Sequence, residues 1–114
     1  MRRGFTILMA LALGACALAP SGVFARVEVA CGAKSLIYSN AEKFDEDVTV
    51  RAADLCSGQD SEVQVMDADG KLLQTFPIPD GTTTDVRVLL RSGQWLNFVC
   101  NGKEGGCSYA VTSK

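Results

Sequence analysis

Histidine is absent from the 114-residue chain, and its absence removes several kinds of chemistry at once. Catalysis by a Ser-His or Cys-His pair needs an imidazole as general base, so neither pair is available. Zinc sites draw on histidine and on closely spaced cysteines, and the chain also lacks any CxxC pair. No motif marks a Ser-Lys pair. Paired carboxylates remain possible at the densest acidic cluster, Asp45-Glu46-Asp47, but such a run is more typical of a solvated loop before a strand. We therefore expect no catalytic residues, no metal site and no cofactor, and predict that the protein is not an enzyme.

The chain also lacks long hydrophobic runs. Its longest apolar run is short and lies in a segment typical of an export signal. Arg2 and Arg3 precede a mostly apolar run of about nine residues, and Ala25 provides a cleavage site. A membrane-spanning helix needs about 20 apolar residues, so this run is too short to span a bilayer. We expect residues 1–25 to be a signal peptide that is removed. Residues 26–114 then form a single domain in the bacterial periplasm or outside the cell.

Two other interpretations of this leader stay open. Leu13-Gly14-Ala15-Cys16 resembles the lipobox of bacterial lipoproteins, in which a lipid anchor at Cys16 would make the protein a membrane-anchored lipoprotein. Arg2 and Arg3 also resemble the core of a twin-arginine signal. The conventional cleavage site just downstream favours export without a lipid.

Positive charge is scarce in the expected mature domain. Arg2 and Arg3 account for two of the 11 basic residues, and the remaining 9 face 13 acidic residues, so the formal charge is −4. These basic residues form no run or stripe. Because phosphate binding draws on clusters of lysine and arginine, we do not expect nucleic acid as a partner.

Cysteine, by contrast, is plentiful for so small a domain. Four cysteines follow the leader, at positions 31, 56, 100 and 107. An even number in an exported chain predicts two disulfides, which compensate for the small core that 89 residues can bury. Spacing alone permits three pairings. We favour Cys31–Cys56 and Cys100–Cys107, and expect both bridges to be structural.

Apolar residues recur at every second position, which is typical of half-buried strands. The clearest stretch has Val86, Val88 and Leu90 alternating with polar or charged neighbours, and similar stretches begin near residues 27, 48, 63, 96 and 107. The cysteines fall in phase with the inward positions. The chain is therefore predicted to be all-β: a small antiparallel β-sandwich of about seven strands stapled by two disulfides, with a small barrel as the alternative.

Turn residues suggest how some of these strands connect. Gly70 suits a three-residue hairpin loop, and its Asp-rich surroundings favour that turn over a calcium site. Residues 91–93 are expected to close a hairpin that sets Val88 opposite Leu96. A further hairpin is expected through 101–106. Pro77 and Pro79 indicate an edge strand or a strand end.

The expected hairpin at 91–93 also predicts a binding surface. It places Leu89 opposite Trp95 on the outer face, with Val99 extending the same stripe, and exposed aromatic residues are enriched in interfaces. We expect a small non-enzymatic binding or inhibitory protein whose partner is another protein or a surface glycan. The alternative is a structural accessory subunit of an envelope or appendage assembly, held by an unpaired sheet edge.

Overall fold

The computed structural model describes residues 26–113, so the expected leader, its cleavage site and Cys16 lie outside the described residues. The described part contains strands and loops without a helix, and none of it forms a helix able to cross a membrane. The eight strands are β1 (Val27–Val29), β2 (Lys34–Ser39), β3 (Glu46–Asp54), β4 (Ser61–Met66), β5 (Leu72–Ile78), β6 (Thr83–Leu90), β7 (Trp95–Val99) and β8 (Cys107–Ser113).

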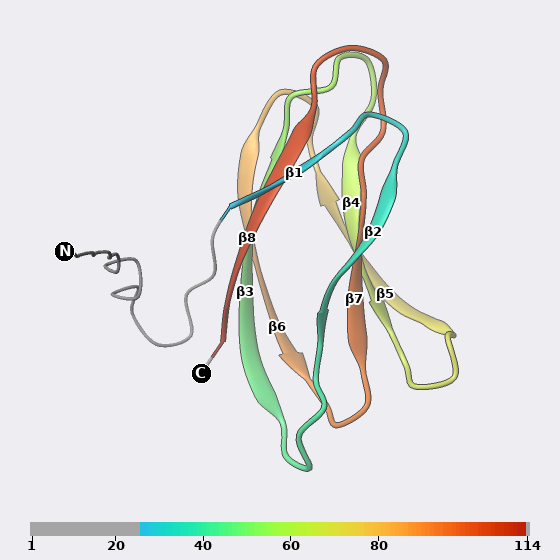
Figure 1. Cartoon of the computed structure of the whole chain (residues 1–114), viewed down its shortest axis with the longest axis vertical. Coiled ribbons are helices and arrows are strands. Elements are labelled where there is room, and N and C mark those ends of the chain that lie inside the picture. The colour runs from blue at the N-terminus through green and yellow to red at the C-terminus, as the bar shows by residue number, and fades with distance from the viewer. Residues whose placement is uncertain (1–25, 114) are drawn as a thin grey trace, which may run out of the picture.

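The strands form two antiparallel sheets that pack face to face (Figure 1). The first, sheet A, has the order β1-β8-β3-β6, and the second, sheet B, has the order β2-β7-β4-β5. Both sheets keep open edges, so the fold is a sandwich and not a closed barrel. The predicted all-β sandwich is confirmed, with eight strands where about seven were expected.

Alternation along the strands builds the core between the sheets. In β3, the side chains of Val48, Val50 and Ala52 point inward and are at most 1% exposed. In sheet B, Phe98 is fully buried and meets the ring of Tyr109 edge to face, at 6.0 Å between ring centroids. Burial of each large apolar side chain stabilises the fold by about 1.5–3 kcal/mol, so these inward rows contribute much of its stability.

Strand pairing differs from the sequence prediction at two loops. Strand β6 pairs with β3 in sheet A, whereas β7 pairs with β2 and β4 in sheet B. Val88 consequently lies opposite Val48, not Leu96, and the predicted hairpin at residues 91–93 is wrong. The predicted hairpin at 101–106 is wrong for the same reason, since that loop also crosses from sheet B to sheet A. Both loops contain residues typical of tight turns. Such a turn can join strands of two different sheets as readily as two strands of one sheet.

Among the described strands, one hairpin lies within a single sheet, and it joins β4 to β5 where it was predicted. Gly70 has a φ of 86°, which a glycine adopts without strain. The Asp67 N–H donates to the Lys71 carbonyl at 2.9 Å, and Asp67 Oδ1 accepts the N–H groups of Asp69 and Lys71. This carboxylate is therefore satisfied by its own turn. As Pro77 predicted, β5 is an edge strand, and it ends at Ile78.

Candidate functional site

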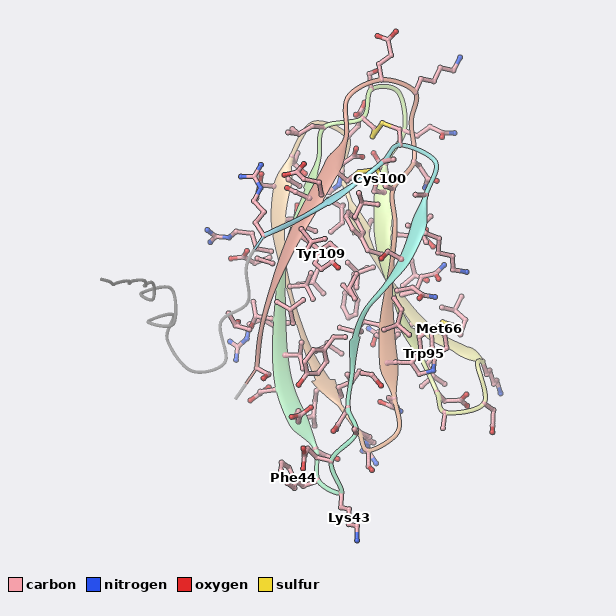
Figure 2. All side chains as sticks on the ribbon, viewed as in Figure 1. Lys43, Phe44, Met66, Trp95, Cys100 and Tyr109 are labelled. Atoms are coloured by element: carbon pink, nitrogen blue, oxygen red, sulfur yellow. A yellow bond between two sulfur atoms is a disulfide. The ribbon has the colours of Figure 1, made fainter. Side chains whose placement is uncertain are left out.

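The four cysteines gather at one end of the sandwich, where the β1–β2, β3–β4 and β7–β8 loops meet (Figure 1; Figure 2). Cys31 bonds Cys56, with 5.8 Å between their Cα atoms, and Cys100 bonds Cys107, with 6.0 Å between theirs. The predicted pairing is confirmed. Cys100 follows a strand of sheet B and Cys107 begins a strand of sheet A, so this bridge ties the two layers together.

The two bridges are in contact with each other. Cys56 Sγ lies 3.2 Å from Cys100 Sγ and 3.7 Å from Cys107 Sγ. Cys56, Cys100 and Cys107 are at most 1% exposed, whereas Cys31 is half-buried. The result is a cluster of four sulfurs in which three cysteines are buried and Cys31 is partly exposed.

Asp54 lies against this cluster, and the sequence analysis missed it. It is fully buried; its Oδ1 accepts the Cys56 N–H at 3.0 Å and lies 3.8 Å from Cys107 Sγ. Asp54 Oδ2 has no hydrogen-bond partner among the described residues. The alternation along β3 could have indicated that Asp54 is buried, because Asp54 occupies the next inward position after Val48, Val50 and Ala52.

The cluster resembles a set of metal ligands only in its spacing. Ligand atoms of Asp54, Cys56 and Cys107 lie within 4.8 Å of one another. Metals bind thiolates, however, and these sulfurs are bonded in pairs. In the oxidised protein the group offers a cation only one buried carboxylate, so its chemistry is that of disulfides.

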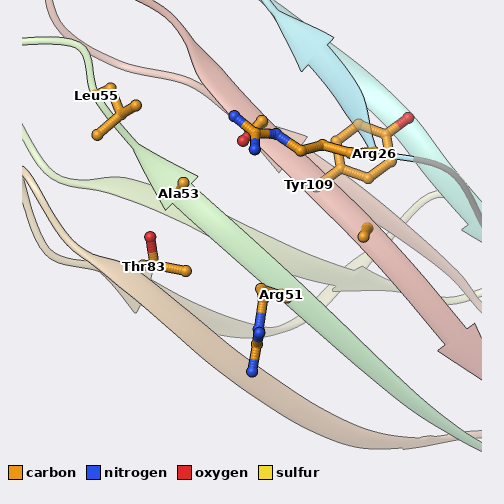
Figure 3. Close-up of a pocket in the computed structure, with 8 residues that line it drawn as sticks. Arg26, Arg51, Ala53, Leu55, Thr83 and Tyr109 are labelled. Atoms are coloured by element: carbon orange, nitrogen blue, oxygen red, sulfur yellow. The ribbon is translucent and has the colours of Figure 1, made fainter.

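The outer face of sheet A has a shallow hollow of about 160 Å³ (Figure 3). Its lining comprises Arg26, Arg51, Ala53, Leu55, Thr83, Ser108, Tyr109 and Ala110. Pockets for small molecules usually measure about 300 Å³ or more, and this hollow contains no carboxylate pair for acid–base catalysis. The guanidinium of Arg51 is already engaged, donating to both oxygens of Asp85 at 2.9 and 3.2 Å.

This exposed ion pair gives a local prediction. The hydrogen bond from Arg51 holds the pKa of Asp85 below its ordinary value of 3.8. The carboxylate therefore favours the folded state above pH 3.8, and this contribution is lost as the pH falls through the lowered value. Arg51→Ala should raise the pKa of Asp85 towards 3.8 in a carboxyl NMR titration. The matched control is Arg87→Ala, which should leave that pKa unchanged; equal shifts in both variants would contradict the assignment.

The predicted binding residues do not form one stripe. Leu89 is 54% exposed on sheet A, whereas Trp95 and Val99 lie on the outer face of sheet B. Trp95 is half-buried: its Nε1 donates to the Asp67 carbonyl at 2.8 Å, and it lies beside its register partner Met66 (Figure 2). The prediction of a shared surface depended on the hairpin expected at residues 91–93, which was wrong. A role in binding stays a prediction for each residue separately.

Comparisons with known proteins bear on the fold. No protein-family model and no curated protein matches the chain. One solved structure, from work on Bacillus endospore appendages described as a novel family of disulfide-linked pili, matches with a TM-score of 0.53 and 12% identity. The match covers 90% of this chain and 98% of that one. At this identity the likeness establishes a shared fold, a two-sheet sandwich, and nothing finer.

Proposed function

We propose that the protein is an exported structural subunit of an extracellular appendage or envelope assembly, joined to further copies of itself through the free edge of β8. The observation that carries the proposal is a segment of β8 that has no strand on its outer side within residues 26–113. The fold shared with an appendage protein gives it weak support. That comparison does not favour the binding or inhibitory role, so the subunit role is the better supported of the two.

Strand β1 covers only part of β8. Its three residues pair with Cys107, Ser108 and Tyr109, and β8 then continues to Ser113 with β3 on its other side (Figure 1). Within residues 26–113, Ala110 to Ser113 thus have a strand partner on one side only. A further strand can add to sheet A at this position.

The hydrogen-bonding groups available there follow from the register. The Leu55 N–H donates to the Gly106 carbonyl at 3.0 Å, which makes this pair a hydrogen-bonded one. In an antiparallel ladder every second pair has this character, so residues 108, 110 and 112 direct their backbone groups towards β3. Val111 and Ser113 direct theirs away from β3. These N–H and C=O groups are the ones a neighbouring subunit would bond.

Edge strands usually carry features that prevent pairing, and the other edges of this sandwich have them. Strand β5 contains Pro77 and a register shift, and β2 has a register shift between Leu36 and Tyr38. In sheet A, β6 exposes Asp85 and Arg87, and the short strand β1 exposes Glu28. The Ala110–Ser113 segment has no charge, no proline and no register shift against β3. It is the edge best suited to association.

Self-association of the oxidised mature domain tests the proposal. In the simplest arrangement two β8 edges pair antiparallel, with Val111 opposite Ser113 of the second copy and the two Thr112 residues facing each other. Thr112→Lys would place like charges directly opposite and should weaken association about two- to fivefold in analytical ultracentrifugation.

The control is Thr49→Lys, which adds the same charge on the same face, opposite Thr112 but in the interior strand β3. It should leave association nearly unchanged. A wild-type domain that stays monomeric at high concentration would refute the proposal, as would equal weakening by both variants.

A further inference from the structure

Only one of the four cysteines in the cluster is partly exposed to solvent. Cys31 lies half-buried in the β1–β2 loop, while its bonding partner Cys56 is fully buried. A thiolate that approaches the cluster therefore reaches Cys31 Sγ first. Attack there makes Cys56 Sγ the leaving group.

The displaced Cys56 sulfur already has a second disulfide beside it. Its distances to Cys100 Sγ and Cys107 Sγ are 3.2 and 3.7 Å, so it lies alongside their bond and closer to Cys100. Exchange requires the attacking sulfur to come in line with the bond that breaks. To reach that position, the Cys56 side chain must turn about its Cα–Cβ bond once it is released from Cys31.

Polar groups are in place to receive Cys107 as the second leaving group. Ser61 Oγ accepts the Asn101 N–H at 2.9 Å, which leaves its own hydrogen free to point at Cys107 Sγ, 3.6 Å away. Asp54 Oδ1 lies 3.8 Å from the same sulfur. The hydroxyl can donate to a Cys107 thiolate, and the carboxyl group can accept from the Cys107 thiol once it is protonated.

We propose that Cys31 is a thiol-exchange site that takes up a small thiol or an exposed cysteine of another protein, while the second disulfide absorbs the displaced bond. The incoming thiolate bonds Cys31 Sγ, the Cys31–Cys56 bond breaks, and its electron pair leaves on Cys56. Cys56 Sγ then bonds Cys100 Sγ, the Cys100–Cys107 bond breaks, and Cys107 takes the proton that the incoming thiol released. Two disulfides exist before and after, so no oxidant is consumed.

The relay keeps the incoming thiol attached. A simple mixed disulfide at Cys31 is reversed when the neighbouring Cys56 thiolate attacks it. After the relay, the free thiol is at Cys107, which clusters with Asp54 and Cys56 and not with the group formed by Cys31, Cys56 and Cys100. Release of the incoming thiol then takes two steps, because Cys107 must first attack the Cys56–Cys100 bond and free Cys56 before Cys56 can attack at Cys31.

Peptide mapping under native conditions tests the relay. The oxidised protein is incubated with reduced glutathione, quenched with N-ethylmaleimide and digested without reduction for mass spectrometry. The expected product carries glutathione on Cys31, a Cys56–Cys100 bond and maleimide on Cys107. A glutathione adduct on Cys31 with maleimide on Cys56 would overturn the relay, as would an absence of adduct or simultaneous loss of both bridges.

Two variants separate the relay from simple reduction. Cys100→Ala/Cys107→Ala removes the acceptor bridge, so the glutathione adduct at Cys31 should fall at least about tenfold because the Cys56 thiolate reverses it. Should that variant fail to fold, Ser61→Ala keeps all four cysteines and removes the donor to Cys107. It should slow formation of the Cys56–Cys100 bond severalfold; an unchanged rate would contradict the assigned leaving group.

Discussion

Replacing Cys31 and Cys56 together with alanine should lower the free energy of unfolding by about 3.5 kcal/mol. The bridge spans 25 residues of sequence, and a closed loop of that length removes about this much conformational entropy from the unfolded chain. The expected total stability of a domain this size is about 5–13 kcal/mol, so the loss is a large fraction of it. Urea unfolding, monitored by Trp95 fluorescence, measures the change.

The second bridge provides the comparison. Cys100 and Cys107 are 7 residues apart, and the same relation gives about 2.5 kcal/mol for their replacement by alanine. Both variants remove a disulfide from the same buried cluster, so the difference between them isolates the effect of loop length. If the shorter loop proved the more costly to open, stabilisation by loop entropy would be wrong for this domain.

The replacement of Asn40 by alanine is expected to cost a similar amount, about 3–4 kcal/mol. Asn40 is fully buried between the β2–β3 and β6–β7 loops. Its Nδ2 donates to the Phe44 and Leu90 carbonyls at 2.9 and 2.8 Å, and its Oδ1 accepts the Glu42 N–H at 2.8 Å. Alanine removes all three hydrogen bonds: the buried one to Leu90 costs about 1–3 kcal/mol, and the two partly buried ones about 0.5–1.5 kcal/mol each.

Thermal and urea unfolding of Asn40→Ala measure this loss, with Asn101→Ala as its control. The Asn101 amide donates a single, exposed hydrogen bond to the Asp60 carbonyl at 3.0 Å, so its removal should cost no more than about 1 kcal/mol. Equal effects of the two substitutions would show that the buried contacts of Asn40 contribute little.

The sequence predicts the faces of the strands better than it predicts their partners. Alternation at Val86, Val88 and Leu90 correctly indicates inward positions, and the phase of Cys100 and Cys107 correctly places them in the core. A repeat of two, however, is the same for any antiparallel neighbour. It does not indicate that β6 pairs with β3 instead of β7, so the hairpin expected at residues 91–93 was wrong.

The buried polar residues show a second limit. Asp54 continues the inward row of β3, and Asn40 immediately follows β2. From sequence alone, a polar residue at such a position indicates a strand end or a loop and not a buried structural role. What makes them structural is the set of backbone groups they meet, and these come from chain segments distant in sequence. Asn40 contacts Leu90, 50 residues away, a pairing that no local pattern contains.

The placement of the terminal strands has a consequence for how the domain is made. Strand β8 lies between β1 and β3, so sheet A includes the first and last strands of the fold side by side. Strands β3 and β6 can meet early in synthesis, but β1 has no neighbour in its sheet until the final residues emerge. Folding dominated by such distant pairings is slow, and a chain truncated before Cys107 would lose the partner of β1 and the centre of the sheet together.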